Sequence, residues 1–446
     1  MPRSVAGKHK KNQTAYAPPT ESQLTIAERI SWLIVAITTT MLPLAVTLSG
    51  KDVFRLPKHL LLEASGIVLA SVAICSMLIA NPLGRGKRWD QTLLVVVGAV
   101  MLWSAVTTLT STNRILSIFS LVTVAAATML FVATYDTVQS RSLAVLYVAL
   151  APALINAVLA IAQRTAVWNP FTLDGEQTAR LRTTALLGNP DDVGMFLVAP
   201  TLAAAALAIA SKRHRVPAII IAMVLVCGML ASETLGAIIA LSAGLFVLIL
   251  SIRPRVAVIA ALVALLLGTG FVRLSPARWS ATRSKIAAAA RGDVDPLLSG
   301  RLPAVLAAWR MFHARPLYGV GLGCFAFHYF DERIAVEMDH PSLLNRSVVN
   351  FGEAHNEHLQ ILAEGGLPAY GIFIVALLLL ARISFRKIEE DGDARSVFAH
   401  RIALPLAVSI FTLTLSSFPL RLAAPTANTL FFCAITMAWS ANARGR

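Results

Sequence analysis

The chain has 446 residues, of which 56% are hydrophobic and only 14% are charged, and its mean hydropathy is +0.69. A soluble protein of this length needs far more charge to cover its surface, so the composition excludes a soluble multidomain protein and predicts a polytopic membrane protein. The net charge of +15 does not indicate a nucleic-acid partner, because the basic residues lie in short clusters between apolar runs, as membrane-flanking charges do.

The apolar runs predict an all-α fold with about twelve transmembrane helices, since roughly twenty apolar residues cross the hydrocarbon core as a helix. Residues 1–28 are expected to form a cytoplasmic tail, because no small-residue cleavage site clearly closes the first apolar run. Residues 29–272 are expected to hold spans 1–9, and residues 367–446 to hold spans 10–12 and the C-terminus. The spans are expected to begin near Ile30, Leu61, Leu93, Leu116, Leu143, Asp192, Pro217, Leu235, Val256, Leu367, Ala403 and Ala424.

The lysine and arginine residues indicate the orientation of the spans. With the N-terminus in the cytoplasm, most basic residues outside the longest loop fall on the cytoplasmic side, and long loops are exempt from this bias. Both termini are therefore expected in the cytoplasm. Two outer segments, residues 164–189 and 273–366, are too long to be simple connectors, and loops of this length are usually functional.

The larger outer segment, residues 273–366, is expected to be partly helical and to carry the chemistry, because it holds five of the nine histidines. Within it, the stretch Arg301–Ala314 has the spacing of an amphipathic helix that would lie along the outer membrane face. The apolar face of this predicted helix consists of Leu302, Val305, Leu306, Trp309 and Phe312.

A first group of candidate residues ends the shorter outer segment. Arg180 and Arg182 precede a Gly-Asn-Pro turn, after which Asp191 and Asp192 open a predicted helix. Asn189 can cap this helix, and the two aspartates complement its dipole, which is a structural explanation for them. The two arginines could simply pair with lipid headgroups. Planar guanidinium groups are also the preferred side chains for bidentate binding of phosphate.

A second group lies in the larger outer segment, where Ser-Gly-Arg301 and Trp-Arg310 precede the glycine-rich residues 319–323. The glycines let the backbone turn tightly or approach a ligand, but they form neither a P-loop nor a dinucleotide fingerprint. Arg301 at a helix start opposes the helix dipole, so it needs an anionic partner or solvent. A ligand-binding role and a purely structural role for Arg301 both remain open.

A third group runs from residue 353 to residue 366. Read as a helix, it places His355, Leu359 and Leu362 on one face and ends at Gly365-Gly366. Imidazole is the usual general base at neutral pH. His355 and His358 are the two histidines of this group, and either could also be an ordinary surface residue. Metal binding is not expected, because the HExxH pattern is absent and no third ligand is recognisably spaced.

In this order and spacing, the motifs resemble those of the O-antigen ligase and polymerase superfamily. The resemblance covers residues 180–371 in motif and the whole chain in topology. Two departures stand out. Ala185 and Asp191 replace a glycine and an asparagine of the family's Arg-xx-Gly-xxx-Asn-Pro-Asn pattern, and residues 232–236 read Ser-Glu-Thr-Leu-Gly where many members carry Ser-Arg-Gly.

The resemblance implies a GT-C-like fold and a metal-independent, cofactor-free, inverting glycosyltransferase of the bacterial inner membrane, active on the periplasmic face. It implies an undecaprenyl-diphosphate-linked glycan as donor, the lipid A-core oligosaccharide as acceptor and membrane lipid as surroundings. On this reading His355 is the general base, and Arg182 and Arg301 are catalytic. The donor diphosphate would be bound by Arg180, Arg182, Arg301 and Arg310, with Asn189, Asn356, Glu364 and Lys58 in support.

Three alternatives compete with the ligase. A polymerase, which extends a second lipid-linked repeat, and a protein O-oligosaccharyltransferase belong to the same superfamily, and the nearly charge-balanced long loop does not choose between these acceptors. A twelve-helix secondary transporter is the rival from another class. A transporter should carry charged residues near the bilayer midplane and show repeated halves. Here no repeat is visible, and the acidic residues fall near span ends: Glu63, Asp191, Asp192 and Glu233. A transferase, with the ligase preferred, is therefore the prediction.

Overall fold

The computed structural model describes most of the chain, and all of the regular structure in that part is helical. Most of the expected N-terminal tail and most of the span expected from Val256 lie outside the described residues. The described residues are 26–47, 52–79, 90–171, 181–259, 276–344, 351–386 and 393–442.

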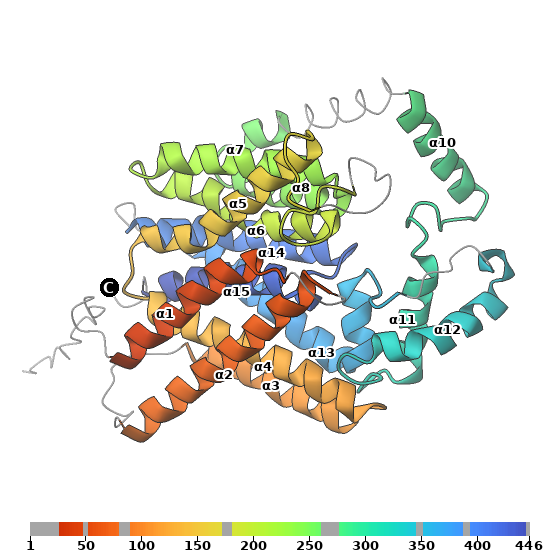
Figure 1. The fold of residues 1–446 in the computed structure, drawn as a ribbon, viewed down its shortest axis with the longest axis horizontal. Helices are drawn as coiled ribbons and strands as arrows, with labels where there is room; N and C mark the ends of the chain where they lie inside the picture. Colours follow the sequence, from red (N-terminus) through yellow and green to blue (C-terminus); the bar gives the residue numbers. More distant parts are fainter. Residues whose placement is uncertain are drawn as a thin grey trace, which may run out of the picture.

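The long helices form one bundle (Figure 1). In the part of the chain that the structure describes, nine segments are long and apolar enough to cross a membrane, and α8 is a shorter apolar helix. These helices confirm the prediction of an all-α, multi-pass membrane protein. They are α1 (Ile26–Met41), α2 (Arg55–Ile79), α3 (Gln91–Leu109), α4 (Arg114–Val138), α5 (Tyr147–Arg164), α6 (Pro190–Ala210), α7 (Arg215–Ser232), α8 (Leu235–Leu250), α13 (Glu357–Ala381) and α14 (Ala394–Thr414). Helix α15 (Ala423–Asn442) completes the bundle and packs against α4, α6 and α14.

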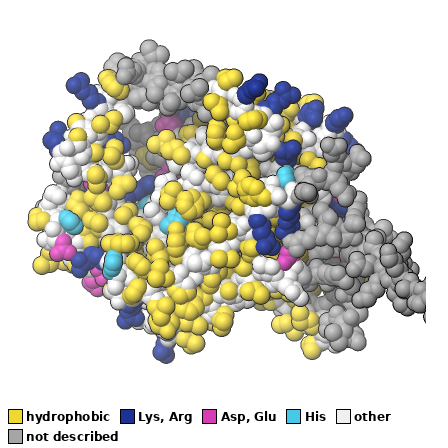
Figure 2. Space-filling model, turned by 180° about the vertical axis from the view of Figure 1, so that it is seen from behind, with side chains coloured by type: hydrophobic (Ala, Val, Ile, Leu, Met, Phe, Trp, Pro, Cys, Tyr) yellow, Lys and Arg dark blue, Asp and Glu magenta, His cyan; other side chains and the backbone are white. Residues whose placement is uncertain are grey.

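Helix α6 is the most buried of the nine membrane-span candidates and packs against α5, α7, α8, α14 and α15. Small residues allow the close approach of helices that a membrane protein needs in place of a hydrophobic driving force. At Gly244 of α8, for example, an added Cβ would collide with the hydroxyl of Ser409 on α14. The outside of the bundle is apolar instead. Figure 2 shows a broad hydrophobic surface with most of its Lys and Arg side chains toward the margins, as suits contact with lipid.

Three further helices lie beyond one end of the bundle (Figure 1): α10 (Pro276–Ala290), α11 (Leu302–Ala314) and α12 (Phe325–Asp339). Helix α11 begins within one residue of the prediction, and it packs on the protein with the face opposite the predicted apolar one. The side chains that α11 buries are Pro303, Ala304, Ala307, Ala308 and Met311, whereas Trp309 is 45% exposed. The small side chains let α11 pack closely on α12 and α13, and this contact decides which face is buried.

Helix α13 begins ten residues before the expected tenth span and contains a break. Gly366 has a backbone conformation (φ 67°, ψ −170°) that is not helical, and the N–H of Leu367 donates a hydrogen bond to the carbonyl of Pro316. An added Cβ at Gly366 would collide with the backbone of Leu317. The predicted break at Gly365-Gly366 is therefore confirmed, as a kink within one long helix rather than as a helix end.

The two ends of the bundle carry different groups. Helices α2, α6, α13 and α15 begin at the end from which α11 and α12 extend, and we call this the His355 end. At the opposite end α3 begins and α13 and α15 finish, and we call this the Arg382 end. Contacts between Arg421 and Glu357 and between Arg386 and Ser440 mark these two ends.

Candidate active site

Helix N-termini converge at the His355 end and favour negative charge there. The side chain of Asn189 caps α6 by accepting a hydrogen bond from the N–H of Asp191 (2.8 Å), which confirms the predicted cap. The side chain of Asn356 caps α13 in the same way, accepting from the N–H of Leu359 (3.0 Å). Unpaired N–H groups and the helix dipole make such ends suited to an anion.

His355 lies in the loop before α13, with its ring between two aromatic rings. The ring of Phe351 is 5.3 Å away and that of Phe418 is 4.9 Å away, centroid to centroid, and both meet the imidazole edge to face. The expectation that His355 shares a helical face with Leu359 was wrong. Because Asn356 caps α13, the helix starts at Glu357, and His355 takes a left-handed conformation (φ 52°) outside it.

The surroundings of His355 keep its imidazole neutral. Burial, together with the nearby positive charges of Arg301 and Arg55, lowers the pKa of His355 to about 4, against the opposing effect of Asp191. Glu353, two residues earlier, has its pKa raised by burial although Arg55 and Arg421 act in the other direction. A neutral imidazole beside two guanidinium groups can accept a proton next to an anion-binding position.

Arg301 has the anionic partner that its position before α11 requires. Its Nη2 lies 3.6 Å from an Asp191 oxygen, and its Nη1 donates to the carbonyl of Ser416 at 3.4 Å. Both distances are long for charge-assisted contacts, which are usually 2.7–2.9 Å. With 31% of its side chain exposed, Arg301 can exchange these partners for a stronger anion such as a phosphate.

A second ion pair at the same end was not predicted. Arg55, the first residue of α2, donates two hydrogen bonds to Asp192 at 3.1 and 3.2 Å, and the Asp192 side chain is only 5% exposed. The sequence predicted only that Asp192 complements the dipole of α6 and identified no partner for it. The pair instead joins the starts of α2 and α6 beside His355.

Lys58 was expected to support the donor site, and its contacts show how it acts. Its ammonium group donates to the carbonyls of Ala45, Phe54 and Leu186 at 2.7, 2.7 and 2.8 Å. All three N–H donors of Lys58 are therefore engaged by the backbone. Lys58 positions the loop before α6 against α2 and has no donor to spare for a ligand.

Arg421 connects two buried glutamates of α13. It donates to Glu357 at 2.9 Å and to Glu364 at 2.6 Å, and these carboxylates are 1% and 2% exposed. Burial opposes the charged form of Arg421, but the two carboxylates outweigh it and raise the pKa of the guanidinium. Glu364 also accepts from the N–H groups of Gly323 and Phe325, so this predicted supporting residue ties three segments together.

The glycine-rich residues 319–323 pack against protein rather than against open space. Gly321 and Gly323 have positive φ values of 117° and 74°, and an added Cβ would collide with Ser111 and Ser120 respectively. Glycine is thus needed for both the conformation and the contact. The glycines of residues 319–323 therefore allow the loop before α12 to lie directly against the turn between α3 and α4 and the start of α4.

The remaining candidate arginines differ in their surroundings. Arg182 is half-buried, and its Nε has no hydrogen-bond partner among the described residues. Arg310 is engaged by two carboxylates of α12, Glu332 at 3.1 Å and Asp339 at 2.6 Å. Arg180 lies outside the described residues. Arg182 therefore has a donor that the described residues do not use, whereas the charge of Arg310 is already matched.

Two further positions show structural roles. His358 is buried and its ring nitrogens contact the Tyr370 hydroxyl (3.2 Å) and the Thr414 hydroxyl (2.9 Å), so it holds α13 against α14. Glu233, which stands in the segment where many superfamily members carry arginine, pairs with Arg164 at 2.5 Å. The basic group at this place is thus supplied by α5 and is neutralised by Glu233.

Comparison with protein families finds a match over part of the chain. Residues 218–374 match the family model described as O-antigen ligase. The matched residues include Arg301, His355 and Glu364. Arg55, Asp192 and Arg421 lie outside the match, although they surround the same site. A search among curated proteins finds no match to the chain. Over residues 218–374 the chain is therefore similar to the O-antigen ligase family.

Proposed function

We propose that the chain is an O-antigen ligase, which transfers a glycan from undecaprenyl diphosphate to the lipid A-core oligosaccharide without a metal ion. The match of residues 218–374 to the O-antigen ligase family supports a glycan-transfer activity in general. The observation that carries the proposal for the site is the neutral imidazole of His355, held between two rings and beside Arg301.

The reaction requires a base for the acceptor and positive charge for the leaving group. The acceptor hydroxyl gives its proton to a His355 ring nitrogen while its oxygen attacks the anomeric carbon of the donor sugar. The bond from this carbon to the diphosphate breaks, and undecaprenyl diphosphate leaves with the electron pair. A single in-line displacement inverts the anomeric centre, and a general base contributes about 10²–10⁴-fold.

The leaving diphosphate would be stabilised by arginine side chains. Arg301 is the leading candidate, because its two contacts are long, and Arg182 is the second, because its Nε is unpartnered among the described residues. Arg180 stays in the proposal from the sequence alone. Arg310 is left out, since Glu332 and Asp339 already engage it. Preorganised charges of this kind act without reorganisation at the moment of reaction.

Bound diphosphate would also strengthen the base. In the absence of substrate, burial and the charges of Arg301 and Arg55 hold the pKa of His355 low, and such an imidazole is a weak proton acceptor at neutral pH. An anion that neutralises Arg301 raises the pKa of His355 toward the working pH. The base is then strongest when the donor is in place, which limits the activation of water in its absence.

We further propose that the His355 end faces the periplasm and that both termini lie in the cytoplasm of a bacterial inner membrane. The Arg382 end supports this orientation, because Arg141, Arg253, Arg382, Arg386 and Arg395 lie near the helix ends on that side. Basic residues gather on the cytoplasmic side of membrane proteins.

The test is deletion of the gene in its own host, followed by electrophoresis of surface lipopolysaccharide. We expect bare lipid A-core, accumulated lipid-linked polymer, and a ladder restored by wild type but not by His355→Ala. His313→Ala is the matched control, because His313 is an exposed histidine on α11. Core capped by a single repeat would identify a polymerase instead. An unchanged ladder would refute both and direct attention to protein glycosylation.

A further inference from the structure

His355 has a backbone conformation that its residue type does not favour. Its φ of 52° lies in the left-handed region, which residues other than glycine rarely adopt. Such a conformation persists where the surrounding structure holds it in place. The cap formed by Asn356 holds the chain directly after His355, and a second contact holds the chain directly before it.

This second contact comes from Gln360, in the first turn of α13. The Oε1 atom of Gln360 accepts a hydrogen bond from the N–H of Ala354 at 2.9 Å. Gln360 is 2% exposed and Ala354 is fully buried, so water does not compete for this contact. Loss of the acceptor would leave a buried N–H group unpaired, which is costly.

The other end of the Gln360 side chain is tied to Glu364. Its Nε2 donates to Glu364 Oε1 at 3.2 Å. The two contacts fix the orientation of the amide, because the backbone N–H of Ala354 can only donate and a carboxylate can only accept. Reversal of the amide would lose both hydrogen bonds.

Glu364 is a firm anchor for this contact. Its carboxylate also accepts from the N–H groups of Gly323 and Phe325 at 2.9 and 3.2 Å and from Arg421 at 2.6 Å. A satisfied buried network of this kind is rigid. Through Gln360, its position is passed on to the loop that carries the proposed base.

We propose that Gln360 is a positioning residue that holds the imidazole of His355 in place for proton transfer. It acts on the backbone at Ala354, and thereby on the left-handed turn that places the ring between Phe351 and Phe418. The inference rests on the proposed role of His355 as the base, but the placement of the ring can be measured without any glycan transfer.

The first test is modification of the purified full-length protein by diethyl pyrocarbonate, which acylates neutral imidazole, followed by mass spectrometry. The rate at His355 is measured against that at His313, an exposed histidine of α11. Gln360→Met keeps the length of the side chain and removes both hydrogen bonds. In this variant His355 should be modified severalfold faster, because its ring is no longer held between two aromatic rings.

A second buried glutamine gives a matched control for this measurement. Gln163 of α5 is 1% exposed, and its Oε1 accepts from the N–H of Ala185 at 2.7 Å. Ala185 is also left-handed (φ 44°) and belongs to the loop before α6. Gln163→Met therefore leaves a comparable buried N–H unpaired, but it should not change the modification of His355.

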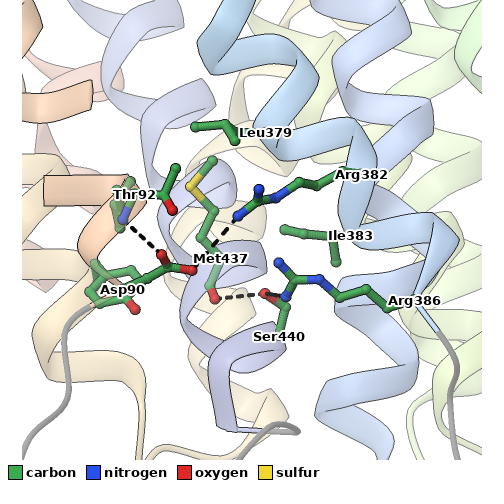
Figure 3. A pocket seen from close by; sticks show the side chains of 10 residues that line it. Asp90, Thr92, Leu379, Arg382, Ile383, Arg386, Met437 and Ser440 are labelled. Carbon is green, nitrogen blue, oxygen red and sulfur yellow. Dashed lines mark hydrogen bonds and ion pairs between the residues drawn. The ribbon is translucent and has the colours of Figure 1, made fainter. Parts of the chain in front are cut away.

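The second test is glycan transfer in proteoliposomes. Gln360→Met should lower kcat by about 10²-fold with little change in KM, because the base is misplaced while the groups that bind the donor remain. Ser440→Ala is the control for this assay. It removes the contact of Ser440 with Arg386 at the opposite end of the bundle (Figure 3) and should transfer at the wild-type rate.

Gln360→Glu tests the two hydrogen bonds themselves. In its protonated form the new carboxyl can accept from Ala354 and donate to Glu364, as the amide does, whereas its charged form is repelled by Glu364. The activity of Gln360→Glu relative to wild type should therefore rise on acidification from about pH 8 to about pH 5, while that of Gln360→Met stays constant. Where Gln360→Met does not fold, modification of His355 in Gln360→Glu, compared with wild type at each pH, takes its place.

Three results would overturn the proposal. They are an unchanged modification of His355 in Gln360→Met, an equal change in Gln163→Met, and no recovery of Gln360→Glu at acidic pH. If the wild type transfers no glycan, the proposed function fails, and the modification of His355 alone then decides whether Gln360 positions it.

Discussion

The ring of His355 meets the ring of Phe418 edge to face at a centroid distance of 4.9 Å. Phe418 belongs to the connection between α14 and α15, which also supplies the Ser416 carbonyl to Arg301 and the Arg421 guanidinium to Glu364. The proposed base, the proposed diphosphate ligand and the buried ion-pair network are therefore fixed by one short segment. This segment lies outside the part of the chain that matches the family.

Replacing Phe418 by alanine should reduce transfer while leaving the protein folded. The ring restricts the imidazole and contributes to its burial, so its loss lets His355 move, and a misplacement of about 1 Å can cost about 10²-fold in rate. The measurement is kcat for glycan transfer in proteoliposomes with a lipid-linked donor. Phe327→Ala is the control, because Phe327 is 53% exposed and its ring meets that of His328 edge to face instead. Equal activity of the two variants would show that Phe418 has no positioning role.

The pH dependence of transfer should report the low pKa of His355. Because His355 must be neutral to accept a proton, kcat/KM should stay level on acidification from neutral pH and fall only as the pH approaches 4. Arg301 is one of the charges that lower this pKa, so the residual activity of Arg301→Gln should fall at a higher pH than that of wild type. The measurement is the profile of kcat/KM between pH 4 and 8 for wild type and for Arg301→Gln. If activity fell at the same acidic pH in both proteins, the proposed effect of Arg301 on the pKa of His355 would be contradicted.

Arg421→Gln should destabilise the protein strongly. It leaves Glu357 and Glu364 buried without a cation, and breaking a buried pair in this way typically costs about 3–5 kcal/mol. The control is Arg310→Gln, which breaks exposed pairs with Glu332 and Asp339 and should cost about 0–1 kcal/mol. Thermal unfolding in detergent compares the two variants. Similar unfolding temperatures would mean that the network around Arg421 adds little to stability.

Features that depend on neighbouring residues were predictable from the sequence. The apolar runs predicted the spanning helices, Asn189 was identified as a cap, and the Gly365-Gly366 pair indicated the break in α13. Each of these follows from a local rule: the thickness of the bilayer, the unpaired N–H groups of a helix start, and the conformational freedom of glycine. His355 was misplaced because a second local signal, the cap at Asn356, was not weighed against the helical spacing.

The long-range pairs could not be predicted in this way. Arg55 and Asp192 are 137 residues apart, and Arg421 and Glu364 are 57 apart. Nothing in the local sequence distinguishes such residues from ordinary charges at the ends of spans, so only the arrangement of the helices reveals the pairs. The buried face of α11 was missed for a related reason, since periodicity detects large apolar residues and not the alanines that allow close packing.

Arg182→Lys should be nearly as damaging to transfer as Arg182→Ala. Lysine keeps the charge but offers a single ammonium group, whereas a diphosphate oxygen pair is matched by the planar guanidinium fork. Arg182 suits this role because its Nε is buried and unpartnered among the described residues. The control is Arg164→Lys, which alters an exposed pair with Glu233 and should leave activity nearly unchanged. The measurement is kcat/KM for the lipid-linked donor, and activity of Arg182→Lys close to that of wild type would show that a charge alone suffices at this position.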